Sequence, residues 1–393
     1  MNAAPPTPST FGATSHQVGS VHPLRLVMLS TFPPSMSGTA RFSDRLTQAL
    51  TDRGVEVGIV RLGDGAASSD PRVIGEVADG SSVSQSRCVE LLNSGDVALI
   101  QHQDDLYTGV HGEALLGILG ALRVPSVVVV HTVLKDPEPH RRWVLERIAA
   151  TADQLVVLSE AARERLCRDY AVERDKVLTI PHGGRIPTSP RLKRPSRPLL
   201  LTWGSLGPGK GIERVIDSMA SLRGVPGQPR YLVVGQTHRK VAAVQGEAYR
   251  EARMEQAVAC GVADSVTLDA RPYDRSALAT LVQSACAVVL PYDSRDQVSS
   301  AILVEAIASG RPVVATAFPH AVELLSHGAG ILVDHDDPAA MDSALRRVLT
   351  QPRLAGAMAA EARRLAPSLA WSTVADSYIR LAERTLVAYR TRQ

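Results

Sequence analysis

The stretch from Asp296 to Thr316, DQVSSAILVEAIASGRPVVAT, predicts a loop, a helix, a turn and a strand in that order. Ser299 or Ser300 suits the N-cap, because a short hydroxyl side chain can accept from the free N–H groups of a first helical turn. The run AILVEAIAS is apolar on nearly every side, which predicts a buried helix. Gly310 suits the left-handed position that ends a helix, and the apolar PVVAT after it predicts a buried strand.

One charged residue, Glu305, interrupts this apolar helix. A buried carboxylate is costly unless it is paired or meets a polar ligand. The start of the same helix offers unpaired N–H groups and the positive end of a dipole, which together favour an anion. A nucleotide would use both features, with its diphosphate at the helix tip and its ribose hydroxyls on Glu305. On this stretch alone, the alternative that Glu305 pairs with a structural arginine is equally open.

Short apolar strands and longer amphipathic helices alternate along the rest of the chain. The first series of strands reads LRLVMLS, VEVGIV, VALIQ, SVVVVH, QLVVL and VLTIP, and the second reads PLLLTWG, RYLVVG, SVTLDA, CAVVLPY, PVVAT and GILV. Strands that alternate with helices form parallel sheets covered on both faces, and nearly continuous apolar strands agree with that burial. We therefore predict an α/β fold with two doubly wound, Rossmann-like parallel sheets. One long helix is expected between RYLVVG and about Cys260.

A proline-rich segment, residues 187–198, separates the two series. Its sequence PTSPRLKRPSRP combines dense proline and basic charge with no apolar period, which predicts a linker. The domains predicted on either side of it are residues 23–186 and residues 199–366. Residues 1–22 lack the basic start and apolar middle of a secretory signal and predict a disordered tail. Residues 367–393 predict a C-terminal helix.

Composition excludes several classes of protein. The 393 residues carry a net charge of +3 with a pI near 8.7, which is too mild to argue for a nucleic-acid partner but permits peripheral contact with an anionic membrane surface. Four cysteines are scattered without a CxxC pair, which argues against a zinc site or a disulfide framework and favours a reducing, cytoplasmic compartment. No apolar run reaches the roughly 20 residues of a membrane-spanning helix.

The opening stretch resembles the signature of the retaining glycosyltransferases of family 4. That signature has two glutamates with seven residues between them, then a small-residue helix end and a Gly-x-Pro-Val-Val strand. Glu305 matches the second glutamate, which the resemblance implies binds the nucleotide ribose, while Gln297 stands at the first, which contacts the donor sugar. Gln297 keeps hydrogen-bonding capacity but cannot stabilise positive charge. The backbone amides implied to reach the donor phosphate or sugar are those of Ser299, Ser300 and Ala301.

A glycine-rich loop, GSLGPGKG, follows the predicted strand PLLLTW. It nearly matches a P-loop, but Gly211 stands where Ser or Thr would bind magnesium, which counts against an NTPase. The family carries an arginine, four residues and a lysine here, both on the donor diphosphate; Ser205 replaces the arginine and Lys210 matches the lysine. The resemblance implies that Lys210 neutralises charge on the leaving nucleoside diphosphate. The alternative is an ordinary strand-to-helix turn with an exposed lysine.

Four further positions follow predicted strands, where open parallel sheets bind ligands. His131 ends SVVVVH, and the resemblance implies that it lies near the donor sugar. His102 follows VALI and is expected to help line the acceptor cleft. Gly38 resembles the glycine loop that lies against the donor diphosphate, and Gly235 ends RYLVVG close to the nucleotide. The alternative for each is a histidine satisfied by the backbone or an ordinary loop residue.

Taken over the chain from Leu24 onward, the resemblance implies the GT-B architecture, in which two Rossmann-like domains face a cleft. The C-terminal domain would hold the donor, the N-terminal domain would hold a sugar, lipid or small-molecule acceptor, and the last helix would cross back onto the N-terminal domain. The implied reaction is retaining transfer of a hexose from a nucleotide-diphosphate sugar, which is a co-substrate, with neither a metal nor a further cofactor.

Other functions remain open. An epimerase on the same architecture would act on the nucleotide sugar without an acceptor. A pyridoxal-dependent phosphorylase would need a Schiff-base lysine, and the chain is short for one. Gln297 and Ser205, which depart from the family pattern, motivate a non-catalytic sugar-nucleotide binding protein. Donor hydrolysis or transfer would eliminate this last alternative.

Overall fold

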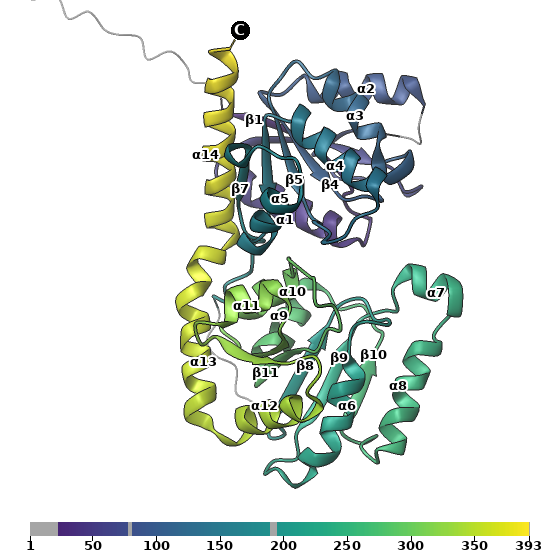
Figure 1. The fold of residues 1–393 in the computed structure, drawn as a ribbon, viewed down its shortest axis with the longest axis vertical. Helices are drawn as coiled ribbons and strands as arrows, with labels where there is room; N and C mark the ends of the chain where they lie inside the picture. The colour runs from purple at the N-terminus through teal and green to yellow at the C-terminus, as the bar shows by residue number, and fades with distance from the viewer. Residues whose placement is uncertain (1–22, 78–80, 189–194, 393) are drawn as a thin grey trace, which may run out of the picture.

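The computed structural model describes residues 23–77, 81–188 and 195–392, which form two α/β domains, one above the other in Figure 1. The predicted tail, residues 1–22, and residues 189–194 of the predicted linker lie outside the described residues. Each domain contains one sheet of parallel strands with helices on both faces. The prediction of two Rossmann-like parallel sheets is therefore confirmed.

The N-terminal sheet has the strand order β3-β2-β1-β4-β5-β6-β7. Its strands are β1 (Arg25–Ser30), β2 (Glu56–Leu62), β3 (Val73–Val77), β4 (Val97–His102), β5 (Ser126–Val130), β6 (Gln154–Val157) and β7 (Val177–Thr179). The helices of this domain are α1 (Gly38–Thr51), α2 (Ser82–Leu92), α3 (Ala114–Gly120), α4 (Pro139–Thr151) and α5 (Glu160–Asp169), with short 3₁₀ turns η1 (Val110–Gly112) and η2 (Arg174–Lys176).

The C-terminal sheet has the order β10-β9-β8-β11-β12-β13. Its strands are β8 (Leu199–Trp203), β9 (Arg230–Val234), β10 (Val266–Asp269), β11 (Ala287–Leu290), β12 (Val313–Thr316) and β13 (Gly330–Val333). The helices are α6 (Ile212–Ser221), α7 (Arg239–Gln245), α8 (Ala248–Ala259), α9 (Arg275–Ser284), α10 (Ala301–Ala308), α11 (Pro319–Leu325), α12 (Pro338–Thr350), α13 (Pro352–Leu365) and α14 (Trp371–Arg390), with 3₁₀ turns η3 (Leu222–Gly224) and η4 (Ala366–Leu369).

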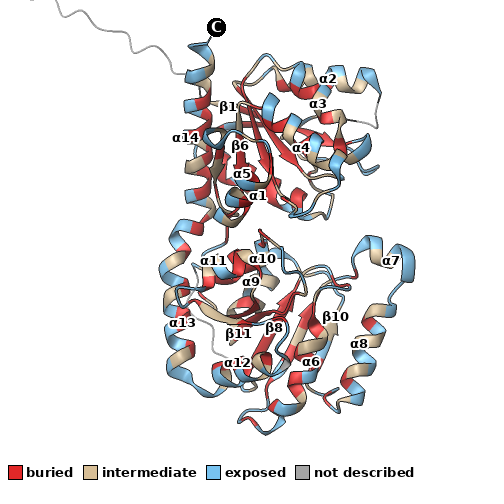
Figure 2. Cartoon of the chain, in the orientation of Figure 1, coloured by how far each residue is buried: buried red, intermediate tan, exposed pale blue. Residues whose placement is uncertain are grey.

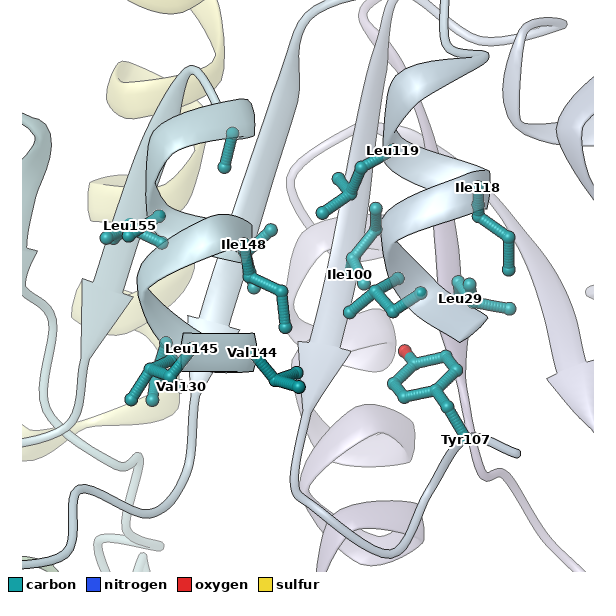
Figure 3. Packing of buried hydrophobic residues seen from close by; sticks show 14 of the residues in the cluster. Leu29, Ile100, Tyr107, Ile118, Leu119, Val130, Val144, Leu145, Ile148 and Leu155 are labelled. Carbon is teal, nitrogen blue, oxygen red and sulfur yellow. The ribbon is translucent and has the colours of Figure 1, made fainter. Parts of the chain in front are cut away.

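Hydrophobic clusters fill both faces of the N-terminal sheet, and the strands are its most buried elements (Figure 2). On one face, Leu29 and Ile100 of the sheet belong to the same cluster as Ile118 of α3 and Ile148 of α4 (Figure 3). Helices α1 and α14 cover the other face. Each fully buried aliphatic side chain contributes about 1.5–3 kcal/mol relative to an exposed one, so the central strands form because both of their faces are covered.

The opening stretch of the sequence folds as predicted. Ser300 is the N-cap of α10, and its Oγ accepts from Leu303 N at 3.3 Å. Gly310, with φ of +66°, follows the helix in the left-handed conformation that a Cβ would disfavour. The chain then enters β12, which pairs with β11 and β13 in the interior of the sheet.

Two parts of the fold differ from the sequence prediction. The long helix expected to reach about Cys260 is two helices, α7 and α8, because Gly246 adopts φ of +60° and ends the first one. Strand β3 and helix α2 were not predicted. Residues of β3 alternate between half-buried and exposed, and the glycine and glutamate of its sequence VIGEV are rare in strands, so its apolar signal is weak.

In both sheets the strand order reverses beside the first strand of the domain. β1 lies between β2 and β4, and β8 lies between β9 and β11. Loops on the two sides of such a point turn toward opposite faces of the sheet, which opens a crevice at the carboxyl ends of the strands. The segments after β1, β4, β8 and β11 contain or adjoin Gly38, His102, Lys210 and Gln297, so four of the predicted site residues lie at these two reversal points.

The last helix returns to the N-terminal domain (Figure 1, yellow). Val374 and Tyr378 of α14 are buried in the cluster that covers β1 and β2, beside α1. Where the chain crosses, Gly184 N donates to Leu369 O at 2.7 Å, and Gly184 forms a parallel bridge with Ala370. The segment that follows β7 and the segment that leads into α14 therefore run side by side between the domains.

Candidate functional site

Helix α10 begins next to the N-terminal domain, and its first amides are partly satisfied. Ser300 N donates to Nδ1 of His320 at 2.8 Å. His320 follows β12, is buried, and has its pKa lowered to about 3 by desolvation, so its ring is neutral and accepts this bond. Ala301, by contrast, is exposed at the first helical position. An anion approaching the N-terminus of α10 would therefore meet Ala301 and the positive end of the helix dipole.

Glu305 lies about one turn further into α10 and faces the other domain. Its Oε1 is 3.3 Å from Nη1 of Arg45 on α1, and the two side chains are 18% and 19% exposed. The partner that the sequence suggested for Glu305 thus exists, but it comes from the opposite domain. Arg41, one turn before Arg45, is exposed, and partial desolvation and the neighbouring Arg45 charge lower its pKa. Helix α1 therefore presents two cations toward the carboxylate of α10.

Lys210 lies in the loop after β8, and the geometry of that loop requires glycine. Its Nζ is 4.8 Å from the ring centroid of Tyr292, and partial burial lowers its pKa. The next residue, Gly211, has φ of +63°, and a Cβ there would overlap the carbonyl oxygen of Pro291. The loops after β8 and β11 are therefore in close backbone contact at this point. This contact holds Lys210 against the segment that leads to α10.

Two other predicted donor-side residues lie beside this loop. Gly235, directly after β9, has φ of +147°, and a Cβ would overlap the carbonyl oxygen of Gly204. The packing of the two loops alone thus accounts for this glycine. Ser205 is exposed in the loop after β8 and carries no charge to add to that of Lys210.

Gln297 lies in the segment between β11 and α10. Its Nε2 donates to Ser299 O at 2.9 Å, and its backbone oxygen accepts from His320 N at 3.3 Å. Ser299 in turn donates through Oγ to the backbone oxygen of His131 at 3.2 Å. The structure thus brings Gln297 and Ser299 of one domain next to His131 of the other.

His131 is fixed within the N-terminal domain. Its Nε2 lies 2.8 Å from Gln101 Oε1, so the ring donates from Nε2, and it packs nearly perpendicular to the ring of Phe42 at 5.0 Å between centroids. Burial and the neighbouring His102 and His182 lower its pKa to about 3, which keeps the ring neutral. Nδ1 is then the ring atom that remains to accept a hydrogen bond from a ligand.

The remaining two N-terminal residues differ in their access to solvent. His102 is only 1% exposed, its pKa is lowered to about 4 by burial, and within the described ranges neither ring nitrogen has a hydrogen-bond partner. It therefore lies beneath the surface rather than on an open cleft. Gly38 is exposed as the first residue of α1, after the N-cap Ser37, and a Cβ there would meet nothing within 4 Å. The fold itself thus does not require glycine at this position.

Two residues of this site were not predicted from the sequence. Arg45 is four residues after Arg41, a spacing that places both on one helical face, but nothing local indicates a partner 260 residues away. His320 lies at the start of α11, four residues after the strand PVVAT, whereas His131 directly follows SVVVV. The rule that ligand-facing residues follow parallel strands could still have identified it.

Models of two related families match consecutive parts of the chain. Residues 36–184 match Glycosyltransferase Family 4, and residues 189–365 match Glycosyl transferases group 1. The D-inositol 3-phosphate glycosyltransferase of Kineococcus radiotolerans is 27% identical, over 93% of this chain and 96% of its own. The enzyme of the same name from Saccharomonospora viridis is 28% identical, over 68% of this chain; the match spans 66% of that relative, just under two thirds.

Solved structures share the fold. Sucrose-phosphate synthase from Thermosynechococcus elongatus superposes with a TM-score of 0.73 at 19% identity, over 93% of this chain and 100% of that one. Anabaena HepE in complex with UDP and glucose gives 0.72 at 16% identity, over 92% and 100%. No helix in the described part of the chain has both the length and the apolar character needed to cross a membrane. The matched families and the two parallel-sheet domains together show that this chain belongs to the family 4, group 1 glycosyltransferases and has the GT-B fold.

Proposed function

We propose that this glycosyltransferase moves a hexose from a nucleotide-diphosphate sugar to an acceptor with retention of configuration. The observation that carries the proposal is the position of Glu305. Its carboxylate lies between the domains, is 18% exposed and, among the residues that the structure describes, has one ion pair, with Arg45 at 3.3 Å. The distance of 3.3 Å is longer than the about 2.7–2.9 Å of a close charge-assisted hydrogen bond, so the pair leaves much of the bonding capacity of the carboxylate unused. Ribose hydroxyls can therefore replace the arginine as donors to Glu305.

The donor diphosphate would lie between Lys210 and the N-terminus of α10. Lys210 supplies a cation whose partial burial strengthens its interaction with an anion. Ala301 supplies an exposed position at the positive end of the helix dipole. Gly38 at the start of α1 leaves open space on the opposite side. These features support a donor held mainly by the C-terminal domain and covered by the N-terminal domain.

In the proposed reaction, the bond between the anomeric carbon and the diphosphate oxygen breaks, and a bond to the acceptor oxygen forms on the same face of the sugar. The leaving phosphate takes the acceptor's proton, and Lys210 stabilises its negative charge. Gln297 and the Nδ1 of His131 would hold donor-sugar hydroxyls. Since neither side chain carries a charge, their role is to orient the sugar rather than to stabilise an oxocarbenium ion.

The N-terminal domain would hold the acceptor, in a reaction that we assign to the cytoplasm. D-inositol 3-phosphate is the first acceptor to test, because the two relatives described above are named for it. UDP-glucose is the first donor to test, because HepE was solved with it. A lipid acceptor would require the protein to contact a membrane surface. Assays of lipid acceptors should therefore supply them in detergent.

The experiment is a thermal-shift panel of UDP, GDP and ADP with their hexose forms. A ligand that binds only the native state adds about 2.7 kcal/mol of stability at 100 times its Kd. We expect one nucleotide family to raise the Tm of the wild type and to lose this effect in Glu305→Ala. Glu361→Ala, which removes a half-buried carboxylate that pairs with Arg364 within α13, should keep the shift. If no nucleotide raises the Tm of the wild type, the chain has kept the fold but does not bind a nucleotide-sugar donor.

A further inference from the structure

The segment 296–299, which carries Gln297 and which we call the docking segment, is bonded to both domains. Asp296 O accepts from Arg165 Nη1 of α5 at 2.6 Å, and Val298 O accepts from Ser159 Oγ, which is also the N-cap of α5. Both donors belong to the N-terminal domain, although the segment itself belongs to the C-terminal one.

The intervening carbonyl, that of Gln297, points the other way. It accepts from His320 N at 3.3 Å, a residue of the C-terminal domain. Alternation of this kind is what an extended segment produces, because successive residues face opposite sides. The docking segment therefore lies between the domains like a strand shared by both, with Gln297 bonded to its own domain and its two neighbours bonded to the other.

A side chain of the docking segment also completes the other domain's core. Val298 is 5% exposed and belongs to the hydrophobic cluster formed by β4, β5, α4 and α5 of the N-terminal domain. Burying a valine contributes about 1.5–3 kcal/mol. The segment is thus fixed on the N-terminal domain by an apolar contact as well as by two hydrogen bonds. Its position relative to α5 is therefore well determined when the domains meet.

Arg165 links this segment to a second functional loop. The same Nη1 that bonds Asp296 O also donates to Val133 O at 3.1 Å. Val133 is two residues after His131, and Asp296 is next to Gln297. One guanidinium therefore connects the backbones of the two loops that carry these candidate sugar-binding residues.

Burying the charged guanidinium of Arg165 costs free energy, so its presence here is explained only if the direction of its hydrogen bonds matters. The side chain is 8% exposed, and its nearest carboxylate oxygen, Asp296 Oδ1, is 3.9 Å from Nη2. A buried cation that bonds mainly to carbonyls gains less than one with a close carboxylate, and an apolar residue would often be at least as stabilising. What an apolar residue could not do is fix the separation of two backbones through directional hydrogen bonds.

We propose that Arg165 is a positioning residue for glycosyl transfer. It sets the position of the Gln297 segment relative to the His131 loop when the two domains come together, and it acts through backbone oxygens without touching either substrate. This inference rests on the proposed function, since it concerns the same site. Donor binding by Lys210 and Glu305 does not involve Arg165. Substitution of Arg165 should therefore affect the rate of transfer and not the affinity for the donor.

The kinetic test compares Arg165→Met and Arg165→Lys with a control on the same helix, Arg163→Met. Arg163 donates to Val177 O and stays within the N-terminal domain. The rate of nucleoside diphosphate release is measured at increasing concentrations of UDP-glucose, GDP-mannose or ADP-glucose. It gives kcat and the KM for the donor. We expect Arg165→Met to lower kcat about 10- to 100-fold, the size of effect that a misplacement of about 1 Å produces. The donor KM should stay within about threefold. Arg165→Lys, which keeps the charge but not the fork of donors, should be intermediate.

A second measurement does not depend on activity. Amide hydrogen exchange of the peptide that covers residues 296–303 should be faster in Arg165→Met and in Val298→Ala than in the wild type, and unchanged in Arg163→Met. Unchanged exchange in Arg165→Met would overturn the proposal, as would a kcat equal to that of the wild type or equal losses of nucleotide affinity and kcat. Wild-type protein that binds none of the three nucleotides would refute the proposed function alone, and the exchange result would still decide the docking role.

Discussion

The carboxylate of Glu305 lies 3.3 Å from the guanidinium of Arg45, so a residue of each domain contributes to one ion pair at the domain boundary. Because both side chains retain some exposure, we expect the pair to add only about 0.2–1 kcal/mol to the free energy of unfolding. A double-mutant cycle with Arg45→Met and Glu305→Gln, measured by urea denaturation, gives this coupling. A coupling above 3 kcal/mol would mean that the pair is structural.

Substitutions of Glu305 and of Arg45 should change the nucleotide affinity in different ways. Glu305→Gln replaces a charged acceptor by a neutral one, which we expect to weaken nucleoside diphosphate binding by about 1.5–3 kcal/mol. Arg45→Met removes a competitor for the carboxylate, so it should leave the affinity unchanged or increase it. Isothermal titration with UDP, GDP or ADP measures both. Equal weakening by the two substitutions would indicate that Arg45 binds the ligand itself.

Gln297→Glu restores the residue that the family pattern carries, yet we expect it not to raise turnover. The Nε2 of Gln297 donates to Ser299 O, and a carboxylate would lose this bond and face the carbonyl oxygen instead. Donor consumption by the variant and by the wild type is the measurement. A sharp rise in kcat without a change in nucleotide affinity would show that the glutamine impairs an enzyme built for glutamate.

Gly38→Ala tests whether glycine at this position is needed for folding or for ligand binding. A Cβ at this position meets nothing within 4 Å and the residue is helical, so we expect the free energy of unfolding to stay the same or to rise by about 0.5–1 kcal/mol. If the donor diphosphate approaches the start of α1, its affinity should fall. Denaturation and nucleotide titration of the same preparation test both expectations. Unchanged affinity would remove Gly38 from the site.

Gly211 and Gly209 form a matched pair in one loop. Both have positive φ, but a Cβ at Gly211 would overlap the carbonyl oxygen of Pro291, whereas one at Gly209 would meet nothing within 4 Å. We expect Gly209→Ala to cost about 1–2 kcal/mol of strain and Gly211→Ala roughly 2–5 kcal/mol, because overpacking adds to that strain. Urea denaturation measures the difference. Similar costs would mean that the loop relaxes freely around Lys210.

The free energy of unfolding should fall as the pH is lowered through the range of histidine titration. Burial lowers the pKa of His320 to about 3, against about 6.5 in an unfolded chain. Below about pH 6.5 the unfolded state therefore binds more protons, and each such histidine removes up to about 1.4 kcal/mol per pH unit until its folded pKa is reached. His102, with a pKa of about 4, acts in the same direction.

His320→Asn tests this expectation, because its amide oxygen can still accept from Ser300 N but does not titrate. Denaturation at several pH values between about 4 and 7 should show a slope reduced by about one proton. The exposed His327, changed to Asn, serves as the control and should leave the slope as it is in the wild type. An identical slope in His320→Asn would mean that the buried ring is not the origin of the acid sensitivity.

Local signals and long-range contacts were not equally predictable from the sequence. The loop, helix, turn and strand around Glu305 were predicted because an N-cap serine, Gly310 and an apolar period act within a few residues. The break at Gly246 was missed, since a single glycine inside a helical pattern only lowers its stability. The pairing of Glu305 with Arg45 and the burial of Val298 in the opposite domain were beyond reach, because each depends on how two domains meet.

The hydrogen bond from Gly184 to Leu369 joins the two segments that connect the domains. A rotation of the domains about this connection would displace residues in proportion to their distance from it. Helix α7 lies on the opposite side of the domain boundary from α13 and α14 (Figure 1), and its Lys240 reaches Asp105 of the N-terminal domain at 3.0 Å. We therefore expect such a rotation to separate this exposed pair before it disturbs the contacts near Gly184 and Leu369.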